Sequence, residues 1–225
     1  MQKETKTISL SLPFRMGSVN CYLIETDAGF VLIDTGSSYS RKELIRELES
    51  AGCKPGLLKL IVLTHGDFDH TGNAAYLRNA FGGKIAMHND DLGMVECGDM
   101  FFNRKKPNIL IKKMITLFSG FGRSERFAPD LLVKDGDNLS EYGMEARVIS
   151  IPGHSKGSIA ILTAGADIFC GDLLVNIDKP VLNSLNDDLA AANASIQKLA
   201  SMKTGTVYPG HGRPFPMHLV EIGSM

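Results

Sequence analysis

Short apolar runs, most of them ending in turn residues, dominate the first third of the chain. TISLSL, VNCYLIET and GFVLIDTG are typical of β-strands. The next run, LLKLIVLT, is almost continuously apolar, which is typical of a strand buried on both faces. The same rhythm returns later in the runs KIAMH, LLVKDGD, EARVISIPGH, SIAILTAG, DIFCGDLL and GTVYPGHG. This pattern predicts a domain rich in β-structure.

Three segments have a helical spacing of apolar residues and predict helices that cover the strands: residues 39–51, 71–80 and 187–202. Four apolar residues of the last helix recur at steps of three and four, which predicts a stripe facing the core. They are Leu189, Ala192, Ile196 and Leu199. Strands mixed with helices predict a single α/β domain over residues 1–225, formed by two β-rich halves.

Residues 91–128 interrupt this rhythm and are rich in Met, Phe, Lys and Arg. We expect an inserted helical segment here, and two interpretations of it stay open. It could be a lid, in which Phe101, Phe102, Met114 and Phe118 offer an apolar wall to a substrate. It could instead be a pair of amphipathic helices that pack on the domain or on a partner subunit, as in a homodimer.

The composition is that of an ordinary globular protein, with 44% hydrophobic and 22% charged residues. The net charge of −1 argues against nucleic acid or anionic lipid as a partner of the whole surface. The N-terminal stretch MQKETKTISLSLPF contains no apolar run of signal-peptide length, and GLLKLIVLT is too short to span a bilayer. The four cysteines form no CxxC pair and are expected to be buried thiols. These features predict a cytoplasmic protein without a membrane span.

The stretch Thr-His-Gly-Asp-Phe-Asp-His-Thr-Gly follows the buried strand directly and precedes a helix. Its side chains therefore leave the carboxyl edge of a sheet, where ligand sites of α/β proteins gather. His65, Asp67 and Asp69 alternate and would project to one side of an extended loop, while His70 turns toward a second position. Carboxylates packed this closely repel one another unless a cation compensates them. The stretch therefore predicts a metal site.

Three further metal-ligand residue types have the same setting, at the point where an apolar strand ends in a glycine turn. His154 follows the strand ARVISI, Asp172 follows DIFCG, and His211 follows TVYPG. A lone histidine at a strand end is more often a hydrogen-bonded structural residue than a ligand. Repetition of the pattern at separate strand ends favours one shared metal centre instead.

The order and spacing of these residues resemble the metallo-β-lactamase superfamily of hydrolases. The pattern of that superfamily is an Asp after an early strand, an HxHxDH loop, and then a His, an Asp and a His at later strand ends. This chain offers Asp34 in LIDTG, an HxDxDH loop, PGHSKGS, CGDLL and PGHG. The resemblance covers nearly the whole chain and implies a four-layer αββα sandwich with a dinuclear metal site at one edge.

Carried over position by position, the resemblance implies two sets of ligands joined by a bridging carboxylate. His65, Asp67 and His154 would hold one metal ion, Asp69, His70 and His211 would hold the other, Asp172 would bridge the two, and Asp34 would orient a ligand of the loop by a hydrogen bond. An Asp at position 172, where certain β-lactamases of the superfamily have Cys, favours the glyoxalase-II-like branch.

One position departs from the common pattern, because Asp67 stands where the superfamily has a His. Two divalent cations, three carboxylates and a bridging hydroxide then sum to zero, whereas the common ligand set leaves one positive charge. We therefore expect two divalent metal ions, zinc first among them, at a site whose first position also accepts iron or manganese.

The mechanism implied by the resemblance is hydrolysis by a metal-bridging hydroxide, with the metal ions stabilising the developing oxyanion. Asp69 and Asp172 are the candidate catalytic carboxylates. The expected substrate is a small molecule: an ester, thioester, lactone or lactam. Ser155, Lys156 and Tyr208 flank the ligands in sequence and are candidates for substrate contact.

Three other functions stay open at this stage. One is a di-iron redox module resembling flavodiiron proteins, which also place a carboxylate at the second position of the loop. Another is a phosphodiesterase or nuclease of the same superfamily, although the net charge of −1 does not favour it. The last is a binding protein with a dead site, which is disfavoured because every motif position keeps a metal-ligand residue type.

Overall fold

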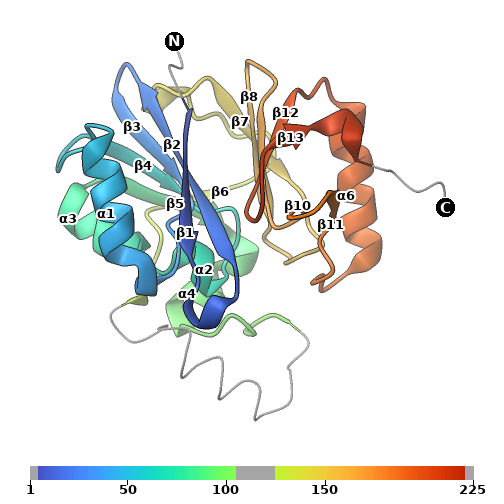
Figure 1. The fold of residues 1–225 in the computed structure, drawn as a ribbon, viewed down its shortest axis with the longest axis horizontal. Coiled ribbons are helices and arrows are strands. Elements are labelled where there is room, and N and C mark those ends of the chain that lie inside the picture. The colour runs from blue at the N-terminus through green and yellow to red at the C-terminus, as the bar shows by residue number, and fades with distance from the viewer. Residues whose placement is uncertain (1–4, 105–124, 221–225) are drawn as a thin grey trace.

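The computed structural model describes residues 5–104 and 125–220, which form two facing β-sheets with helices on their outer sides (Figure 1). In the first sheet β1, β2 and β3 are antiparallel, and β3 to β6 run parallel. Across the sheet the strands are β1 (Thr5–Ser11), β2 (Ser18–Thr26), β3 (Gly29–Ile33), β4 (Leu58–Val62), β5 (Lys84–His88) and β6 (Leu131–Val133).

The second sheet is mostly antiparallel, with β9 and β12 as its parallel pair. Its strands in spatial order are β13 (Phe215–Pro216), β12 (Thr206–Pro209), β9 (Ile168–Gly171), β8 (Ile159–Thr163) and β7 (Ala146–Ser150). A separate antiparallel hairpin joins β10 (Leu174–Asn176) to β11 (Pro180–Leu182). The three-residue strands of this hairpin are too short to show an alternation, and the sequence pattern did not predict them.

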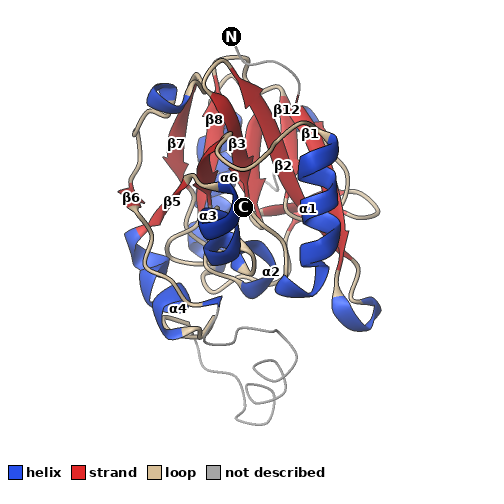
Figure 2. Ribbon diagram, turned by 90° about the vertical axis from the view of Figure 1, so that its left-hand side faces the viewer, coloured by secondary structure: helices blue, strands red, loops and turns tan. Residues whose placement is uncertain are grey.

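The helices cover the outer faces of the two sheets. Figure 2 looks onto the first sheet from the side of α1 and α3, and these helices lie in front of its strands. On the far side of the molecule α6 packs against the second sheet (Figure 1). The helices are α1 (Arg41–Ser50), α2 (Phe68–Thr71), α3 (Ala74–Phe81), α4 (Leu92–Cys97) and α6 (Leu189–Ser201).

Three hydrophobic cores separate these four layers. The first lies between the helices and the first sheet, where Leu44 of α1 and Leu77 of α3 pack against residues of β1. The second lies between the two sheets and joins Ile33 to Phe169. The third lies between the second sheet and α6, where Ile196 packs. The expected αββα sandwich is therefore confirmed.

The expected helix over residues 71–80 begins only at Ala74, as α3, because Gly72 and Asn73 separate it from the short helix α2. A Cβ atom at Gly72 would come within 2.6 Å of the Ser38 nitrogen, so the chain passes too close to its neighbour for any other residue. Asn73 turns its amide away from the helix and donates to the carbonyls of Thr35 at 2.7 Å and Ser37 at 2.9 Å. Tertiary contacts thus interrupt a segment whose apolar spacing is helical.

The expected stripe of the last helix is correct for Ala192, Ile196 and Leu199, which are buried. It is wrong for Leu189, which is 60% exposed. Leu189 is the first residue of α6, and the Asp188 side chain accepts a hydrogen bond from Ala191 to begin the helix there.

The segment at 91–128 is described only in part. Residues 91–104 and 125–128 include α4 and the turns after it, whereas the expected lid residues Met114 and Phe118 lie outside the described residues. Phe101 is half-buried and Phe102 is exposed. Among the described helices, none combines the length and apolar character that a membrane crossing requires.

Candidate metal centre

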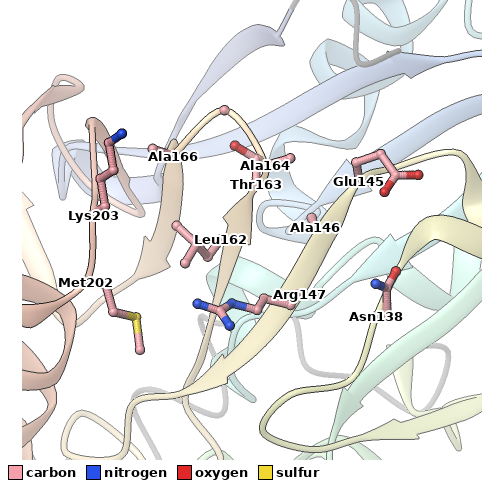
Figure 3. Close-up of a pocket in the computed structure, with 11 residues that line it drawn as sticks. Asn138, Glu145, Ala146, Arg147, Leu162, Thr163, Ala164, Ala166, Met202 and Lys203 are labelled. Atoms are coloured by element: carbon pink, nitrogen blue, oxygen red, sulfur yellow. The ribbon is translucent and has the colours of Figure 1, made fainter.

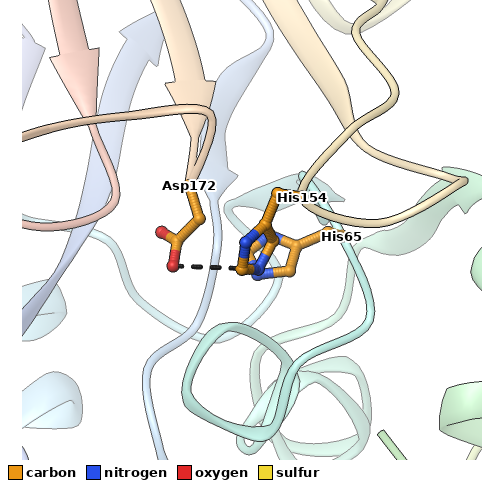
Figure 4. Close-up of side chains that lie close together, drawn as sticks. All are labelled: His65, His154 and Asp172. Carbon is orange, nitrogen blue, oxygen red and sulfur yellow. Dashed lines mark ion pairs between the residues drawn. The ribbon is translucent and has the colours of Figure 1, made fainter. Parts of the chain in front are cut away.

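The seven predicted ligand residues come together at one edge of the sandwich, from four segments of the chain. Four of them lie on the β4–α2 loop and on α2 itself, and the others follow β7, β9 and β12. Figure 4 shows His65, His154 and Asp172 reaching toward one another from three different segments. The carboxyl ends of strands in both sheets therefore supply the site.

The first group of side chains consists of His65, His154 and Asp172, whose ligand atoms all lie within 4.8 Å of one another. The two imidazole rings stand edge to face with their centroids 4.7 Å apart. All three residues are buried. Such a group offers two nitrogens and one oxygen to a single metal ion, which is a ligand set typical of zinc or iron.

The second group consists of Asp69, His70 and His211, with the same 4.8 Å limit between its ligand atoms. Asp172 also contacts this group, because its two carboxylate oxygens lie 3.2 Å from His70 Nε2 and 3.2 Å from His211 Nε2. The same carboxylate is 4.0 Å from His154 Nε2. Asp172 thus lies between the two groups, where a bridging ligand would lie.

All four imidazole rings are anchored through Nδ1, which leaves Nε2 to face the cluster. Each Nδ1 lies within hydrogen-bond distance of an oxygen atom outside the ligand set, and this fixes both the tautomer and the tilt of the ring. These oxygens are Thr64 Oγ1 at 3.0 Å from His65, Asp34 Oδ2 at 2.8 Å from His70, the Leu185 carbonyl at 2.5 Å from His154 and the Ser18 carbonyl at 2.7 Å from His211.

Asp34 occupies the position from which it was expected to orient the loop. Its Oδ1 accepts from the Thr64 amide at 2.8 Å, and its Oδ2 accepts from the Thr64 hydroxyl at 2.7 Å and contacts His70. The residue adopts a positive φ of 58°, a conformation that Asp tolerates better than most residues. One buried carboxylate therefore orients His70 and, through the Thr64 hydroxyl, His65.

Buried atoms without hydrogen bonds test whether these residues fit a metal ion. His65 Nε2, His70 Nε2 and Asp172 Oδ1 are buried and have no hydrogen-bond partner among the described residues. Leaving such atoms unpaired in the interior costs about 1–3 kcal/mol each. A cation in each of the two ligand groups would satisfy them all. The donor set fits a metal centre.

Close packing of the backbone around the cluster supports the same interpretation. A Cβ atom at Gly210 would lie 2.1 Å from Asp172 Oδ1 and 2.7 Å from His70 Cε1. A Cβ atom at Gly171 would lie 2.6 Å from Thr64 Oγ1. Glycine at these two positions lets the chain pass directly behind the ligands.

The electrostatics of the cluster show how strongly it attracts positive charge. Burial alone would lower the pKa of His211, but Asp172 and Asp69 outweigh burial and raise the pKa to about 10. Burial alone would likewise lower the pKa of His70, and Asp172, Asp34 and Asp69 together raise it instead. Without another cation, these carboxylates keep protons on the histidines.

Asp67 lies at the border of the first group. Its Oδ2 is 3.1 Å from His154 Nε2 and 3.6 Å from His65 Nε2, while its Oδ1 is bound by Arg104. Burial alone would raise the pKa of the Asp67 carboxyl, but Arg104, His154 and His65 outweigh burial and hold the pKa well below its ordinary value. The side chain is therefore a carboxylate that faces the cluster with one oxygen.

Two residues near the ligands were missed by sequence reasoning, Arg104 and Asp91. Asp91 is only 1% exposed, and it accepts from the Gly66 amide at 3.0 Å and the Gly157 amide at 2.9 Å. It also accepts from the Ser155 hydroxyl at 2.6 Å. Asp91 thus ties the loop of His65 to the loop of His154. Neither Asp91 nor Arg104 carries a local sequence signal, because each is one charged residue among other polar residues.

The three residues that were expected to contact substrate lie in different surroundings. Ser155 is buried and donates to Asp91, so the expectation that it touches substrate is corrected to a structural role. Tyr208 stacks on Phe169, with centroids 4.7 Å apart, and packs into the core between the sheets. Lys156 is exposed two residues after His154 and keeps its place as a candidate.

A pocket of about 580 Å³ opens elsewhere on the molecule, over β7, β8 and the segment after α6 (Figure 3). Arg147, Glu145 and Lys203 are its charged lining residues. None of the lining residues belongs to the ligand groups. Its lining residues contain no cluster of ligand or nucleophilic side chains. The chemistry of the metal cluster decides between the two places.

Comparison with known proteins agrees with this geometry. The chain is 27% identical over 202 residues to the Beta-lactamase-like protein 2 homolog of Caenorhabditis elegans, covering 89% of this chain and 58% of that protein. It is 26% identical over 216 residues to the Acyl-coenzyme A thioesterase MBLAC2 of Bos taurus, covering 87% and 74%. The chain thus spans little more than half of the first relative.

The solved structure of TTHA1623 in a di-iron-bound form superposes with a TM-score of 0.72 at 28% identity, covering 95% of this chain and 96% of that one. The sequence pattern of the Metallo-beta-lactamase superfamily matches residues 15–211. The match begins before β2 and ends at His211, so it includes every predicted ligand. The chain belongs to the metallo-β-lactamase superfamily.

Proposed function

We propose that this protein is a dinuclear metallohydrolase that cleaves a small ester, thioester, lactone or lactam. The observation that carries the proposal is the pair of adjoining ligand groups with Asp172 between them. Four imidazoles turn Nε2 toward a common centre because Nδ1 of each is already engaged. A structural histidine cluster would satisfy both nitrogens by hydrogen bonds.

In this proposal His65, His154 and Asp67 hold the first metal ion, with Asp67 contributing Oδ2 alone. The second metal ion is held by the other group, which consists of Asp69, His70 and His211. Asp172, which lies between the two groups, would contribute to both positions. Zinc is the first choice for nitrogen-rich sites of this kind, and the di-iron form of TTHA1623 supports iron as well.

The bound metal ions would supply Lewis acidity and activate a water molecule at neutral pH. The protein supplies the geometry. Asp69 lies 3.5 Å from His211 Nε2 and is the least buried carboxylate of the cluster, with 14% of its side chain exposed. It is therefore placed to accept a proton as water attacks the substrate. The anchored histidines cannot rotate to follow a moving charge, which is the preorganisation that stabilises an oxyanion.

Two observations favour thioesters within this substrate range. One relative is named an acyl-coenzyme A thioesterase and aligns with 87% of this chain. Lys156 is exposed beside the His154 loop and offers a positive charge to an anionic substrate group. The named relative favours the glyoxalase-II-like branch over the true β-lactamases, whereas the lysine suits any anionic substrate.

The test is a comparison of three alanine variants on a panel of thioesters, esters, lactones, lactams and phosphodiesters. His70→Ala and Asp172→Ala should each lower kcat/KM by several orders of magnitude, and both should lose bound metal. His218→Ala is the control, because this histidine is exposed and belongs to neither ligand group. Equal rates in all three variants would refute the assignment of the site.

The di-iron redox module is the second candidate, and the di-iron form of TTHA1623 is the specific observation in its favour. Purified protein loaded with iron decides between the two. Oxygen consumption with an external electron donor, together with no hydrolysis of any panel substrate, would replace the hydrolase proposal. Efficient metal-dependent cleavage of the phosphodiesters would promote the nuclease alternative instead.

A further inference from the structure

Arg104 is a buried cation whose partners all belong to the neighbourhood of the first ligand group. Only 8% of its side chain is exposed. Its Nη1 donates to Asp67 Oδ1 at 2.6 Å, and its Nη2 donates to the His154 carbonyl at 3.3 Å. Its Nε lies 2.9 Å from Asp187 Oδ2. One guanidinium therefore contacts two loops that carry ligands and a third that precedes α6.

The two oxygens of Asp67 face opposite ways as a result. Oδ1 faces Arg104, and Oδ2 faces His154 and His65. A carboxylate that was free to rotate could offer both oxygens to a metal ion. With Oδ1 held at 2.6 Å by a charge-assisted hydrogen bond, Asp67 has a single oxygen for the cluster.

The same contact changes the charge of the first ligand group. Burying a guanidinium is costly unless it is paired, and Asp67 is the buried partner, with 8% of its side chain exposed against 28% for Asp187. The positive charge of Arg104 therefore offsets the negative charge of Asp67, while water screens Asp187. Seen from the cluster, Asp67 with Arg104 carries no net charge.

We propose that Arg104 is a positioning residue that makes Asp67 a one-oxygen, charge-compensated ligand, so that the pair takes the place of a neutral ligand at the first metal position. The inference rests on the proposed function. It also removes the charge difference expected from the sequence, because one guanidinium restores the positive charge that a carboxylate at position 67 takes away. The first metal position is then no less Lewis-acidic than one with a neutral ligand.

The shape of the Arg104 guanidinium group matters as well as its charge. Its planar fork donates to two acceptors on different loops and forms an ion pair with Asp187 on a third, which an ammonium group on a single stem cannot do with the same geometry. Arg104→Lys should therefore keep much of the charge effect and lose the positioning. Arg104→Gln should lose both.

The experiment is a double-mutant cycle read out as metal binding. Metal-free protein is titrated with Zn²⁺ in a calorimeter, and Co²⁺ spectra report the geometry of each position. Arg104→Gln should weaken one of the two Zn²⁺ sites by about 10- to 100-fold and leave the other unchanged. Arg104→Lys should fall between this variant and the wild type. Asp67→His alone should also weaken the site, because it strands the Arg104 cation beside the metal.

The double variant Asp67→His with Arg104→Gln should restore Zn²⁺ affinity to within about three-fold of the wild type. A merely structural role of Arg104 would predict additive losses instead, so this rescue is the decisive readout. Arg78→Gln is the matched control. It removes a partly buried guanidinium whose partners, Asp130 at 3.3 Å and the Ala128 carbonyl, belong to neither ligand group, and Zn²⁺ binding should not change.

The possible failures can be told apart. Wild-type protein that binds no Zn²⁺ would overturn the proposed function and this inference together. Wild-type protein that binds two Zn²⁺ ions and hydrolyses a panel substrate, alongside an Arg104→Gln variant with unchanged affinities, would overturn the inference alone. A double variant that binds no better than the weaker single variant would do the same. Circular dichroism of each metal-free variant checks that the fold is intact.

Discussion

Replacing Asp91 by alanine should destabilise the whole domain, although this residue lies in none of the predicted ligand groups. Its carboxylate is buried and joins the two halves of the molecule through Gly66 on one side and Ser155 and Gly157 on the other. Alanine removes the acceptor and leaves two backbone amides in the interior without a partner. The Ser155 hydroxyl is less affected, because Ser158 Oγ lies 2.7 Å away and can take its place.

The size of the effect follows from these contacts. An unsatisfied buried donor costs about 1–3 kcal/mol, so two backbone amides cost roughly 2–6 kcal/mol, with about 4 kcal/mol as the central value. For a protein of this length a loss of about 4 kcal/mol lowers Tm by roughly 8–16 °C. Asp91→Asn keeps one acceptor oxygen, which can accept a hydrogen bond from only one of the two backbone amides. It should therefore lower the free energy of unfolding by about half as much as Asp91→Ala.

Urea unfolding of the metal-free protein, followed by circular dichroism, measures this directly. Asp90→Ala is the matched control, because the neighbouring carboxylate has 53% of its side chain exposed and should change the free energy of unfolding by less than about 0.5 kcal/mol. The expected order of destabilisation is Asp91→Ala, then Asp91→Asn, then Asp90→Ala. A loss of less than about 1 kcal/mol for Asp91→Ala would show that the two loops are held together by other contacts.

Three further outcomes are expected. Metal binding should strengthen at least about tenfold per pH unit between pH 7 and 9, because His211, whose pKa is raised to about 10, must lose its proton to bind. Affinities that are flat above pH 7 would contradict this. Under native conditions a thiol reagent should modify one cysteine, the exposed Cys97, whereas all four cysteines should react in the denatured protein. Gly210→Ala should abolish metal binding in calorimetry, since its Cβ would lie 2.1 Å from Asp172 Oδ1, while Gly165→Ala, whose Cβ has 3.7 Å of room, should bind as the wild type does.

The strand ends could be predicted from the sequence because each ligand stands beside a local signal. An apolar run followed by Gly and His or Asp marks the carboxyl end of a strand, and carboxyl ends of the strands meet at one edge. This reasoning placed His65, His154 and His211 without any knowledge of how the strands pair. It works because burial and turn chemistry are properties of a few adjacent residues.

Asp91 and Arg104 could not be found in this way, because their roles depend on partners that are distant in sequence. Asp91 lies 25 residues from Gly66 and 64 from Ser155, and Arg104 lies 37 residues from Asp67. A charged residue in a polar stretch is normally solvated, and nothing nearby marks either one as buried. Both residues are buried and meet their partners only when the two β-rich halves of the domain pack together.

Hydrogen bonds within the protein hold the ligand loops in place, and the contacts of the His211 loop show how. Asn20 of β2 donates its side-chain amide to the carbonyls of Pro209 at 3.1 Å and Gly212 at 2.7 Å, and the Tyr22 hydroxyl donates to Pro209 as well. The first sheet therefore holds a loop of the second sheet on both sides of the ligand. Asp91 does the same for the His154 loop.

A cluster that is held from both halves differs from a metal site that folds only around its ion. Hydrogen bonds from the surrounding protein already order the ligand side chains. Metal binding therefore does not have to provide the free energy that this ordering requires. The unpaired Nε2 atoms and the repelling carboxylates then represent stored free energy that binding releases. The same carboxylates raise the pKa values of His211 and His70, and the buried Arg104 offsets the negative charge of Asp67.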